Sequence, residues 1–394
     1  VKECQRMRGY LPSALEDEDP EVQDAAVKGF AALGGDGATA AILRHASGLD
    51  PEREPERIAA AIEAMVKVGN SEDLQKVVLE PGQEELTLQI AMGVLLRVDA
   101  PAAIPILIRI FWSHSRDLQR VIILELAGRA GREHTDFFLD VLSRHKDGNV
   151  LRGALLFLGR KGDPAVVFDV ISPFLDHPYD DVKESALEAL IALHTPEVEA
   201  FFKQLANSDQ MVRRMMGVYG LGFFGLGGTV RELSAALDDE APEVRKVAVG
   251  AFGRSCPLPE ECLAMIEQKL GDESSEVRMA VFDTLGLCSD ERYLSSLIVG
   301  LSDQDPWVRI RCAEGLGENK AQQAVAPLVE MLEDENPLIV IKALTALGMI
   351  GGEAAFRAML PLLEHPDTDV REAGEEAVNV IQRQAGEQDG FASH

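Results

Sequence analysis

Histidine and cysteine are the side chains that most often bind transition metals or act in catalysis, so their spacing indicates which chemistry a chain can support. The eight histidines are scattered and none is followed by glutamate: they are His45, His114, His134, His145, His177, His194, His365 and His394. The five cysteines include no pair separated by two residues, the spacing of zinc and redox motifs. We therefore expect no catalytic residues, no metal and no cofactor.

A glycine-rich stretch at residues 217–228 is the other segment that could do chemistry, since glycine-rich loops can bind phosphate groups. Such loops lie between a strand and a helix, whereas this stretch follows a segment with helical periodicity. We interpret it as a distorted junction and a candidate flexible joint, with Phe223 and Phe224 buried inside it. Its glycines do not indicate a nucleotide site.

The sequence repeats itself at intervals of 30 to 36 residues, most of them 31 or 32. Each repeat carries an apolar residue, here numbered position 0, a small or apolar residue at +4, an apolar residue at +8 and often glycine at +9. Position 0 is held in turn by Val22, Ile58, Leu88, Gln119, Val150, Val182, Arg213, Val244, Val277, Val308, Ile339 and Val370. A period of this length indicates a solenoid of stacked units.

Each repeat predicts two helices joined in a hairpin. Positions 0, +4 and +8 lie on one face of the second helix, because a helix completes a turn in 3.6 residues. Pro20, Pro242, Pro306 and Pro337 stand at the start of this helix, where a backbone N–H has no partner in any case. Glycine at +9 is expected to form the left-handed turn that ends the helix. It is found at Gly159, Gly253, Gly286, Gly317 and Gly348.

Small residues at +4 predict close contact between helices, so this position is expected to be buried. Its members include Ala26, Ala154, Ala186, Ala248, Cys312 and Ala343. A single hairpin cannot bury its apolar face alone, whereas stacked neighbours share one continuous core. We therefore predict an all-α solenoid of about twelve hairpins over residues 1–383, followed by a polar, disordered tail at 384–394.

The segments Asp239 to Gly253, Asp272 to Gly286 and Asp303 to Gly317 resemble HEAT repeats, in particular the short form also found in phycobilisome lyase subunits. The resemblance covers nearly the whole chain and implies that the turn aspartate pairs with the basic residue at +1 of an adjacent repeat. Position +1 holds Arg120, Lys183, Arg214, Arg245, Arg278, Arg309 and Arg371, and is broken by Gln23, Ala59, Gln89, Leu151 and Val340. Because such repeats serve scaffolds, transport receptors and a few enzymes, the resemblance alone does not give the function.

The 66 acidic and 38 basic residues give a formal net charge of -28. A protein that binds nucleic acid neutralises phosphates with lysine and arginine, so this charge argues against a nucleic-acid partner. No apolar run reaches the roughly 20 residues that a membrane-spanning helix needs. We expect a cytoplasmic protein without a membrane span, whose acidic surface favours basic partners.

The cysteines are too few and too irregular for a disulfide framework: they are Cys4, Cys256, Cys262, Cys288 and Cys312. Cys256 and Cys288 occupy equivalent turns of consecutive repeats, so a metal-binding or redox role for this pair stays open beside no role at all. His177 and His365 stand in the acidic turn, where histidine can cap a helix as aspartate does.

Apolar residues at positions where the template predicts solvent are candidates for partner binding, since contiguous exposed apolar surface marks interaction sites. Position −1 holds polar residues in most repeats, but Trp307 and Leu338 in two consecutive ones. Position +2, which faces the concave side in HEAT superhelices, holds Ile90, Val121, Met215, Met279, Ile310 and Ile341. Position +6 holds Glu125, Glu188, Tyr219, Asp283, Glu314 and Glu376. The alternative is that the +2 residues pack against the neighbouring repeat.

We predict a partner-binding site formed by Trp307, Leu338, Met215, Tyr219, Met279, Asp283, Ile310, Glu314 and Ile341. Apolar anchors would supply affinity, and acidic residues would supply charge complementarity. The predicted function is a non-enzymatic scaffold or adaptor that holds a basic or amphipathic protein segment on its concave face. Two alternatives stay open: a lyase-type or regulatory subunit acting on a modified protein, and a purely architectural spacer.

Overall fold

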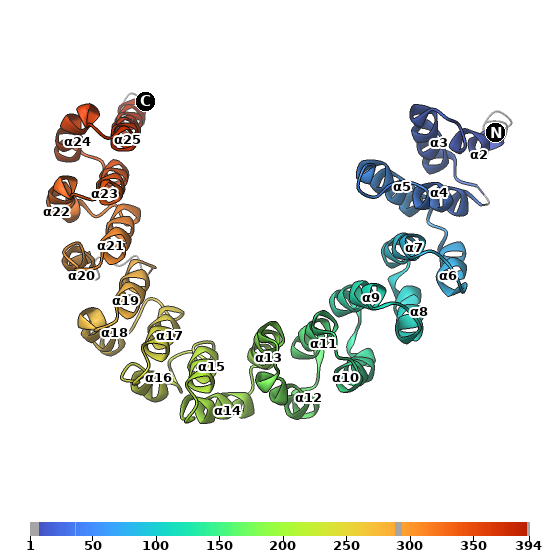
Figure 1. The fold of residues 1–394 in the computed structure, drawn as a ribbon, viewed down its shortest axis with the longest axis horizontal. Coiled ribbons are helices and arrows are strands. Elements are labelled where there is room, and N and C mark those ends of the chain that lie inside the picture. Colours follow the sequence, from blue (N-terminus) through green and yellow to red (C-terminus); the bar gives the residue numbers. More distant parts are fainter. Residues whose placement is uncertain (1–7, 36, 288–293, 392–394) are drawn as a thin grey trace. The chain divides into compact units, whose positions relative to one another are not determined.

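Helical hairpins repeat along the chain in the computed structural model, which describes the backbone of residues 8–35, 37–287 and 294–391 (Figure 1). The described residues contain α-helices and short 3₁₀ helices but no strand. They divide into two units, Val1–Leu193 and His194–His394. The described residues of each unit form six hairpins, so the predicted all-α solenoid of about twelve hairpins is confirmed.

In unit 1 the first helices of the hairpins form one layer and the second helices form another (Figure 1). The first helices are α2 (Leu11–Leu15), α4 (Ala38–Ser47), α6 (Ser71–Leu79), α8 (Ala100–Ile110), α10 (Thr135–Arg144) and α12 (Pro164–Ile171). The second helices are α3 (Pro20–Leu33), α5 (Pro55–Val68), α7 (Glu85–Val98), α9 (Arg116–Arg129), α11 (Gly148–Lys161) and α13 (Asp180–Leu193).

Unit 2 has the same two layers. Its first helices are α14 (Pro196–Ala206), α16 (Val230–Ala236), α18 (Glu260–Glu267), α20 (Leu294–Gly300), α22 (Val325–Glu330) and α24 (Glu353–Met359). Its second helices are α15 (Met211–Leu221), α17 (Pro242–Gly253), α19 (Ser275–Leu287), α21 (Pro306–Glu318), α23 (Pro337–Ile350) and α25 (Thr368–Phe391).

Short 3₁₀ helices join several of these elements. They are η1 (Phe111–Ser113), η2 (Arg132–His134), η3 (Ser172–Asp176), η4 (Gln268–Gly271), η6 (Gln322–Ala324), η7 (Met331–Glu333) and η8 (Leu360–Glu364). Helix α25 runs on past residue 384, where we expected the tail to begin. The disorder of that tail and the joint at 217–228 stay predictions.

The second helices supply much of the core through positions 0 and +4. The predicted burial at +4 is confirmed, since Ala26, Ala154, Ala186, Ala248, Cys312 and Ala343 are all buried. Position 0 is buried from Ile58 to Val370 except at Arg213, which is half-buried. Val22 departs from the template, because its side chain is 37% exposed.

Gln119 is a polar residue at the buried position 0. Its amide nitrogen donates a hydrogen bond to the Phe111 carbonyl at 3.0 Å, and its amide oxygen lies 3.0 Å from His145 Nε2. A buried polar group is tolerated when its hydrogen bonds are satisfied. Position 0 of this repeat is therefore buried as in most other repeats, although it holds a polar side chain whose hydrogen bonds are satisfied.

Replacing Ala248 by leucine is expected to lower the free energy of unfolding by about 1–3 kcal/mol, because the added carbons must enter a closely packed contact. Ala248 has no exposed surface. The same substitution at the exposed Ala264 on α18 is the matched control and is expected to change stability by less than about 0.5 kcal/mol. Urea denaturation measures both. Equal stability of the two variants would show that the repeat register is wrong.

Arginines at +1 join consecutive repeats, which confirms the ladder that the HEAT resemblance implied. The distances from arginine Nε to the next turn's aspartate Oδ2 are 2.7 Å for Arg214–Asp239, 2.9 Å for Arg245–Asp272 and 2.8 Å for Arg278–Asp303. Arg120–Asp147 and Arg309–Asp334 repeat the contact at 2.6 and 3.2 Å through Nη2. Lys183 and Arg371 instead contact their own repeats.

Each ladder aspartate has a second role at the start of a second helix. Asp272 Oδ1 accepts a hydrogen bond from the Ser274 backbone N–H at 2.9 Å, while Arg245 Nη1 donates to the Asp239 carbonyl in its own turn. The aspartate therefore fixes its own turn and receives the previous repeat's arginine. Hydrogen bonding from Arg278 holds the pKa of Asp303 below its usual value, although burial acts in the opposite direction.

The ladder is broken where an apolar residue at +1 faces a histidine turn. Leu151 precedes His177 and Val340 precedes His365, and both apolar side chains are buried. His177 Nδ1 accepts the Tyr179 backbone N–H at 3.2 Å, and His365 Nδ1 accepts from residue 367 at 3.2 Å. Histidine thus fixes the turn as aspartate does, as predicted, but without an arginine from the preceding repeat.

The glycines at +9 do not form the left-handed turn that we expected, so that prediction is wrong. These glycines lie inside the second helices or at their ends and do not adopt positive φ angles. A Cβ added at Gly159 would lie 2.5 Å from Ala189 Cα, and one at Gly317 would lie 2.9 Å from Ala346 Cα. Glycine at +9 therefore permits close approach of the next second helix at its +7 position.

Candidate binding groove

A groove of about 500 Å³ lies across three neighbouring second helices of unit 2, α19, α21 and α23. Its lining residues are Ser275, Glu276, Met279, Asp305, Trp307, Val308, Ile310, Arg311, Glu314, Leu338 and Lys342. The apolar side chains come from positions −1 and +2, together with Val308 at position 0, and charged side chains surround them. The groove is thus built from equivalent positions of three consecutive repeats.

Trp307 is held at the surface by the way its helix begins. Asp305 caps α21 by accepting the Trp307 backbone N–H at 2.9 Å, and Pro306 occupies the first turn. Val308 then points into the core, and successive helical side chains are about 100° apart, so Trp307 faces the groove. The indole is 59% exposed, and Leu338, capped in the same way by Asn336, is 36% exposed. The expected exposure of both side chains is confirmed.

Basic residues of the chain itself hold the acidic groups beside the groove. Arg311 contacts Asp283 at 3.1 Å and Glu314 at 2.9 Å, and Lys342 contacts Glu314 at 2.7 Å. Lys246 reaches Glu276 at 3.0 Å. The acidic residues that we expected to face a partner's cations therefore already have ion-pair partners, and an incoming cation must share or replace them.

The two +6 carboxylates differ in their electrostatics. Burial raises the pKa of Asp283, since its ion pair with Arg311 offsets the loss of hydration only in part. Burial acts in the same direction on Glu314, but hydrogen bonds from Lys342 and Arg311 outweigh it and lower the pKa. Glu314 therefore holds its charge more firmly than Asp283.

Five of the nine residues predicted from sequence line this groove: Met279, Trp307, Ile310, Glu314 and Leu338. Ile310 is 3% exposed, so it forms the floor rather than a contact surface. Asp283 is joined to the groove through Arg311, and Ile341 is half-buried on α23 outside its lining. Met215 and Tyr219 lie on α15, which is not part of the groove.

Several residues that matter here were not predicted from the sequence. Arg311 and Lys342 at +3 line the groove, and their periodicity relative to Trp307 and Leu338, four residues earlier, was available in the sequence. Val212 occupies position −1 of α15 and is 51% exposed, like Trp307 in its own repeat. Phe223, which we expected to be buried, is 40% exposed, whereas Phe224 is half-buried against His194.

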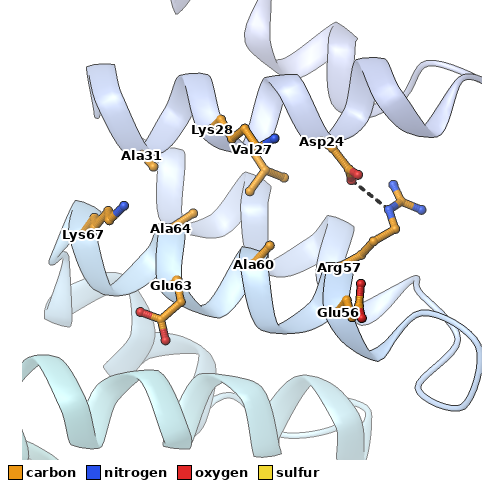
Figure 2. A pocket seen from close by; sticks show the side chains of 10 residues that line it. All are labelled: Asp24, Val27, Lys28, Ala31, Glu56, Arg57, Ala60, Glu63, Ala64 and Lys67. Carbon is orange, nitrogen blue, oxygen red and sulfur yellow. Dashed lines mark hydrogen bonds and ion pairs between the residues drawn. The ribbon is translucent and has the colours of Figure 1, made fainter.

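Unit 1 contains a further groove of about 390 Å³ between α3 and α5 (Figure 2). The small side chains of Ala31, Ala60 and Ala64 form its floor. Acidic and basic side chains are equally frequent around this floor. Figure 2 shows Asp24 and Arg57 joined at one end, at 2.8 Å. The groove contains none of the predicted site residues and offers no excess of charge to a ligand.

The remaining sites of possible chemistry are few in the part of the chain that the structure describes. Within it, no three His, Cys, Asp or Glu side chains are placed to share a metal ion. Over the same residues, no helix has both the length and the apolar character to span a membrane. Cys256 is disulfide-bonded, whereas Cys4 and Cys288 lie outside the described residues.

The stacked hairpins and the arginine–aspartate ladder define an α-solenoid of short helical repeats. The family model for HEAT repeats matches residues 230–300 and 294–379. The matched part of the chain, residues 230–379, therefore carries HEAT repeats, and the finer resemblance to phycobilisome lyase subunits stays a prediction. No protein of curated function matches the chain.

Two solved structures show the same fold at low sequence identity. A structure of Kap95p with RanGDP has a TM-score of 0.63 at 13% identity and covers 95% of this chain and 60% of its own. A structure of the karyopherin Kap121p bound to the extreme C-terminus of the protein phosphatase Cdc14p has a TM-score of 0.53 at 14% identity, with 96% and 46% covered. This chain thus spans less than two thirds of either karyopherin, and the likeness concerns the fold alone.

Proposed function

We propose that the chain is a non-enzymatic scaffold or adaptor whose unit 2 groove holds a basic or amphipathic protein segment. The observation that carries the proposal is the 59% exposed indole of Trp307 in an apolar groove shared by three repeats. Large aromatic side chains in such patches commonly dominate binding energy. The net charge of -28 supports a basic rather than an acidic partner.

The groove supports binding better than a purely architectural role. A spacer needs only solvated polar residues on this face, which is what most repeats place at position −1. Trp307, Leu338 and Met279 instead leave apolar surface in contact with water, which is costly unless a partner covers it. The likeness to Kap121p, which is bound to a segment of another protein, is consistent with this use of the fold.

Trp307→Ala is expected to weaken binding of a short fluorescein-labelled peptide of leucines and lysines by about thirtyfold, which corresponds to about 2 kcal/mol. The fold should keep its stability, because the indole packs against little of the core. Val299→Ala on α20 removes an apolar side chain that is 69% exposed outside the groove, and it should leave affinity unchanged. Fluorescence anisotropy measures affinity and thermal unfolding measures stability.

The dependence of affinity on salt distinguishes the contribution of the acidic surface from that of the Trp307 indole. Raising the ionic strength should weaken the peptide's affinity for both the parent protein and Trp307→Ala, because screening acts on the acidic surface and not on the indole. Equal affinity of Trp307→Ala and the parent protein at every salt concentration would exclude the groove as the binding site. Unfolding of the variant would show that Trp307 is a packing residue instead.

The expected cytoplasmic location stays a prediction.

A further inference from the structure

A second surface of unit 2 differs in charge from the rest of this acidic chain. Residues 210–231 contain no Asp or Glu, and no other stretch of the sequence without acidic residues is as long. The stretch includes helix α15 and the turn that follows it. Helix α15 and the turn that follows it therefore contribute no carboxylate of their own, in a chain with a net charge of -28.

An apolar stripe runs along this surface. Met211, Met215, Tyr219 and Phe223 are spaced by four residues, which places them on one side of α15 and its C-terminal turn. Met211 is 37% and Phe223 is 40% exposed, and the two side chains between them are half-buried. The stripe does not belong to the groove around Trp307, since α17 lies between α15 and α19.

Arg254 covers the end of the stripe with its guanidinium group. The guanidinium carbon lies 4.6 Å from the centre of the Tyr219 ring and 4.4 Å from that of Phe223, which are themselves in edge contact at 5.3 Å. Arg254 Nη1 donates to the Gly250 carbonyl at 3.3 Å. Across residues 8–35, 37–287 and 294–384, no carboxylate forms an ion pair with this arginine, unlike the ladder arginines.

The space beside Arg254 is open. Gly250 is exposed on α17, and a Cβ added there would meet no atom within 4 Å. The guanidinium lies against two aromatic rings, Arg254 is exposed, and Nη1 makes its hydrogen bond to the Gly250 carbonyl. Such a group is suited to bidentate hydrogen bonds with a carboxylate, and the rings beside it reduce its hydration.

We propose that α15 and Arg254 form a second docking surface, which takes an acidic protein segment with apolar side chains. The segment's carboxylate binds Arg254, and its apolar side chains lie on Met215 and Phe223. Charge complementarity selects this occupant, because Arg254 has no carboxylate partner among the described residues and α15 supplies no carboxylate of its own. A basic segment would meet the Arg254 charge without compensation, so the surface differs in preference from the groove at Trp307.

Two short fluorescein-labelled peptides with identical leucines, separated by glutamates in one and by lysines in the other, test this proposal. Carbon-13 labels on the methionine methyl groups report where each peptide binds, because Met211 and Met215 lie on α15 and Met279 lies in the groove. The glutamate peptide should shift the methyl signals of Met211 and Met215 but not that of Met279. Arg254→Gln should weaken its affinity by about tenfold.

Arg160→Gln is the matched control, since it removes an exposed arginine on α11 of unit 1, and it should leave affinity unchanged. The proposal is overturned if the glutamate peptide leaves Met211 and Met215 unshifted, or if the lysine peptide shifts them equally. It is also overturned if Arg254→Gln keeps full affinity. Binding of the lysine peptide at Met279 is a separate outcome that concerns the groove alone.

Discussion

Replacing Arg245 by leucine is expected to lower the free energy of unfolding by about 3–5 kcal/mol, because the change leaves a buried carboxylate without its partner. The side chains of Arg245 and Asp272 are 8% and 6% exposed, and they share two hydrogen bonds of 2.9 and 2.8 Å. Asp272 cannot reach water without breaking the turn that it holds through the Ser274 N–H. Urea denaturation of the variant measures the loss.

The double variant Arg245→Leu/Asp272→His is expected to recover most of this stability. Its pair of residues is the one that the chain already uses at Leu151 with His177, where histidine fixes the turn alone. A double-mutant cycle with both single variants gives the coupling energy. The double variant could instead lose as much unfolding free energy as the two single variants combined. That result would show that the histidine turns depend on something besides this exchange.

Acid pH gives an independent measure of the same pair. Burial alone would raise the pKa of Asp272, but the hydrogen bond from Arg245 prevails and the pKa lies below its usual value of 3.8. A carboxylate with a lowered pKa stabilises the fold above its unfolded pKa, and this contribution is lost as the pH falls through the folded pKa. The difference between the parent protein and Arg245→Leu should therefore shrink below about pH 4.

Gly159→Ala is expected to cost about 1–3 kcal/mol or more, because the new methyl group would lie within 3 Å of Ala189 backbone atoms. Backbone atoms cannot move aside as a flexible side chain can, so α11 and α13 must separate. Gly286 occupies the same +9 position on α19, where an added Cβ would lie 3.7 Å from Gly315 Cα. Gly286→Ala should be neutral or stabilise by up to about 1 kcal/mol, since alanine favours a helix.

Opposite effects at two equivalent glycines would be diagnostic of the close contact. Thermal unfolding of both variants measures them under the same conditions. If both substitutions stabilise, the helices at Gly159 have room that the structure does not show. If both destabilise alike, the glycines serve a backbone conformation, as the sequence first suggested, and not the packing of neighbouring helices.

Much of the fold follows from periodicity, because positions 0 and +4 must face a shared core in every repeat. The ladder was also open to prediction from this sequence alone. Arg214, Arg245 and Arg278 each precede an aspartate turn, whereas Leu151 and Val340 each precede a histidine turn. The +1 residue and the turn residue of the next repeat thus change together, which indicates that the two residues are in contact.

Other features depend on distances that a repeat template does not contain. Glycine suits both a left-handed turn and a close helix contact, so Gly159 alone could not distinguish them. The template placed Trp307 and Leu338 at the surface, but not the ion pairs that Arg311 makes beside them. Arg254 belongs to the repeat that follows Tyr219 and contacts its ring. Arg254 lies beyond +9, so it is at none of the repeat positions from which the sites were predicted.

The arginine–aspartate ladder also bears on how a chain of this kind can change length over evolutionary time. Removing residues 303–333 would bring Asp334 opposite Arg278 in place of Asp303, so the new junction would have the same ion pair as the old one. The same deletion at a junction between leucine and histidine would leave mismatched neighbours. Gain and loss of whole hairpins is therefore easiest between Arg214 and Asp334, where consecutive junctions carry the same arginine–aspartate pair.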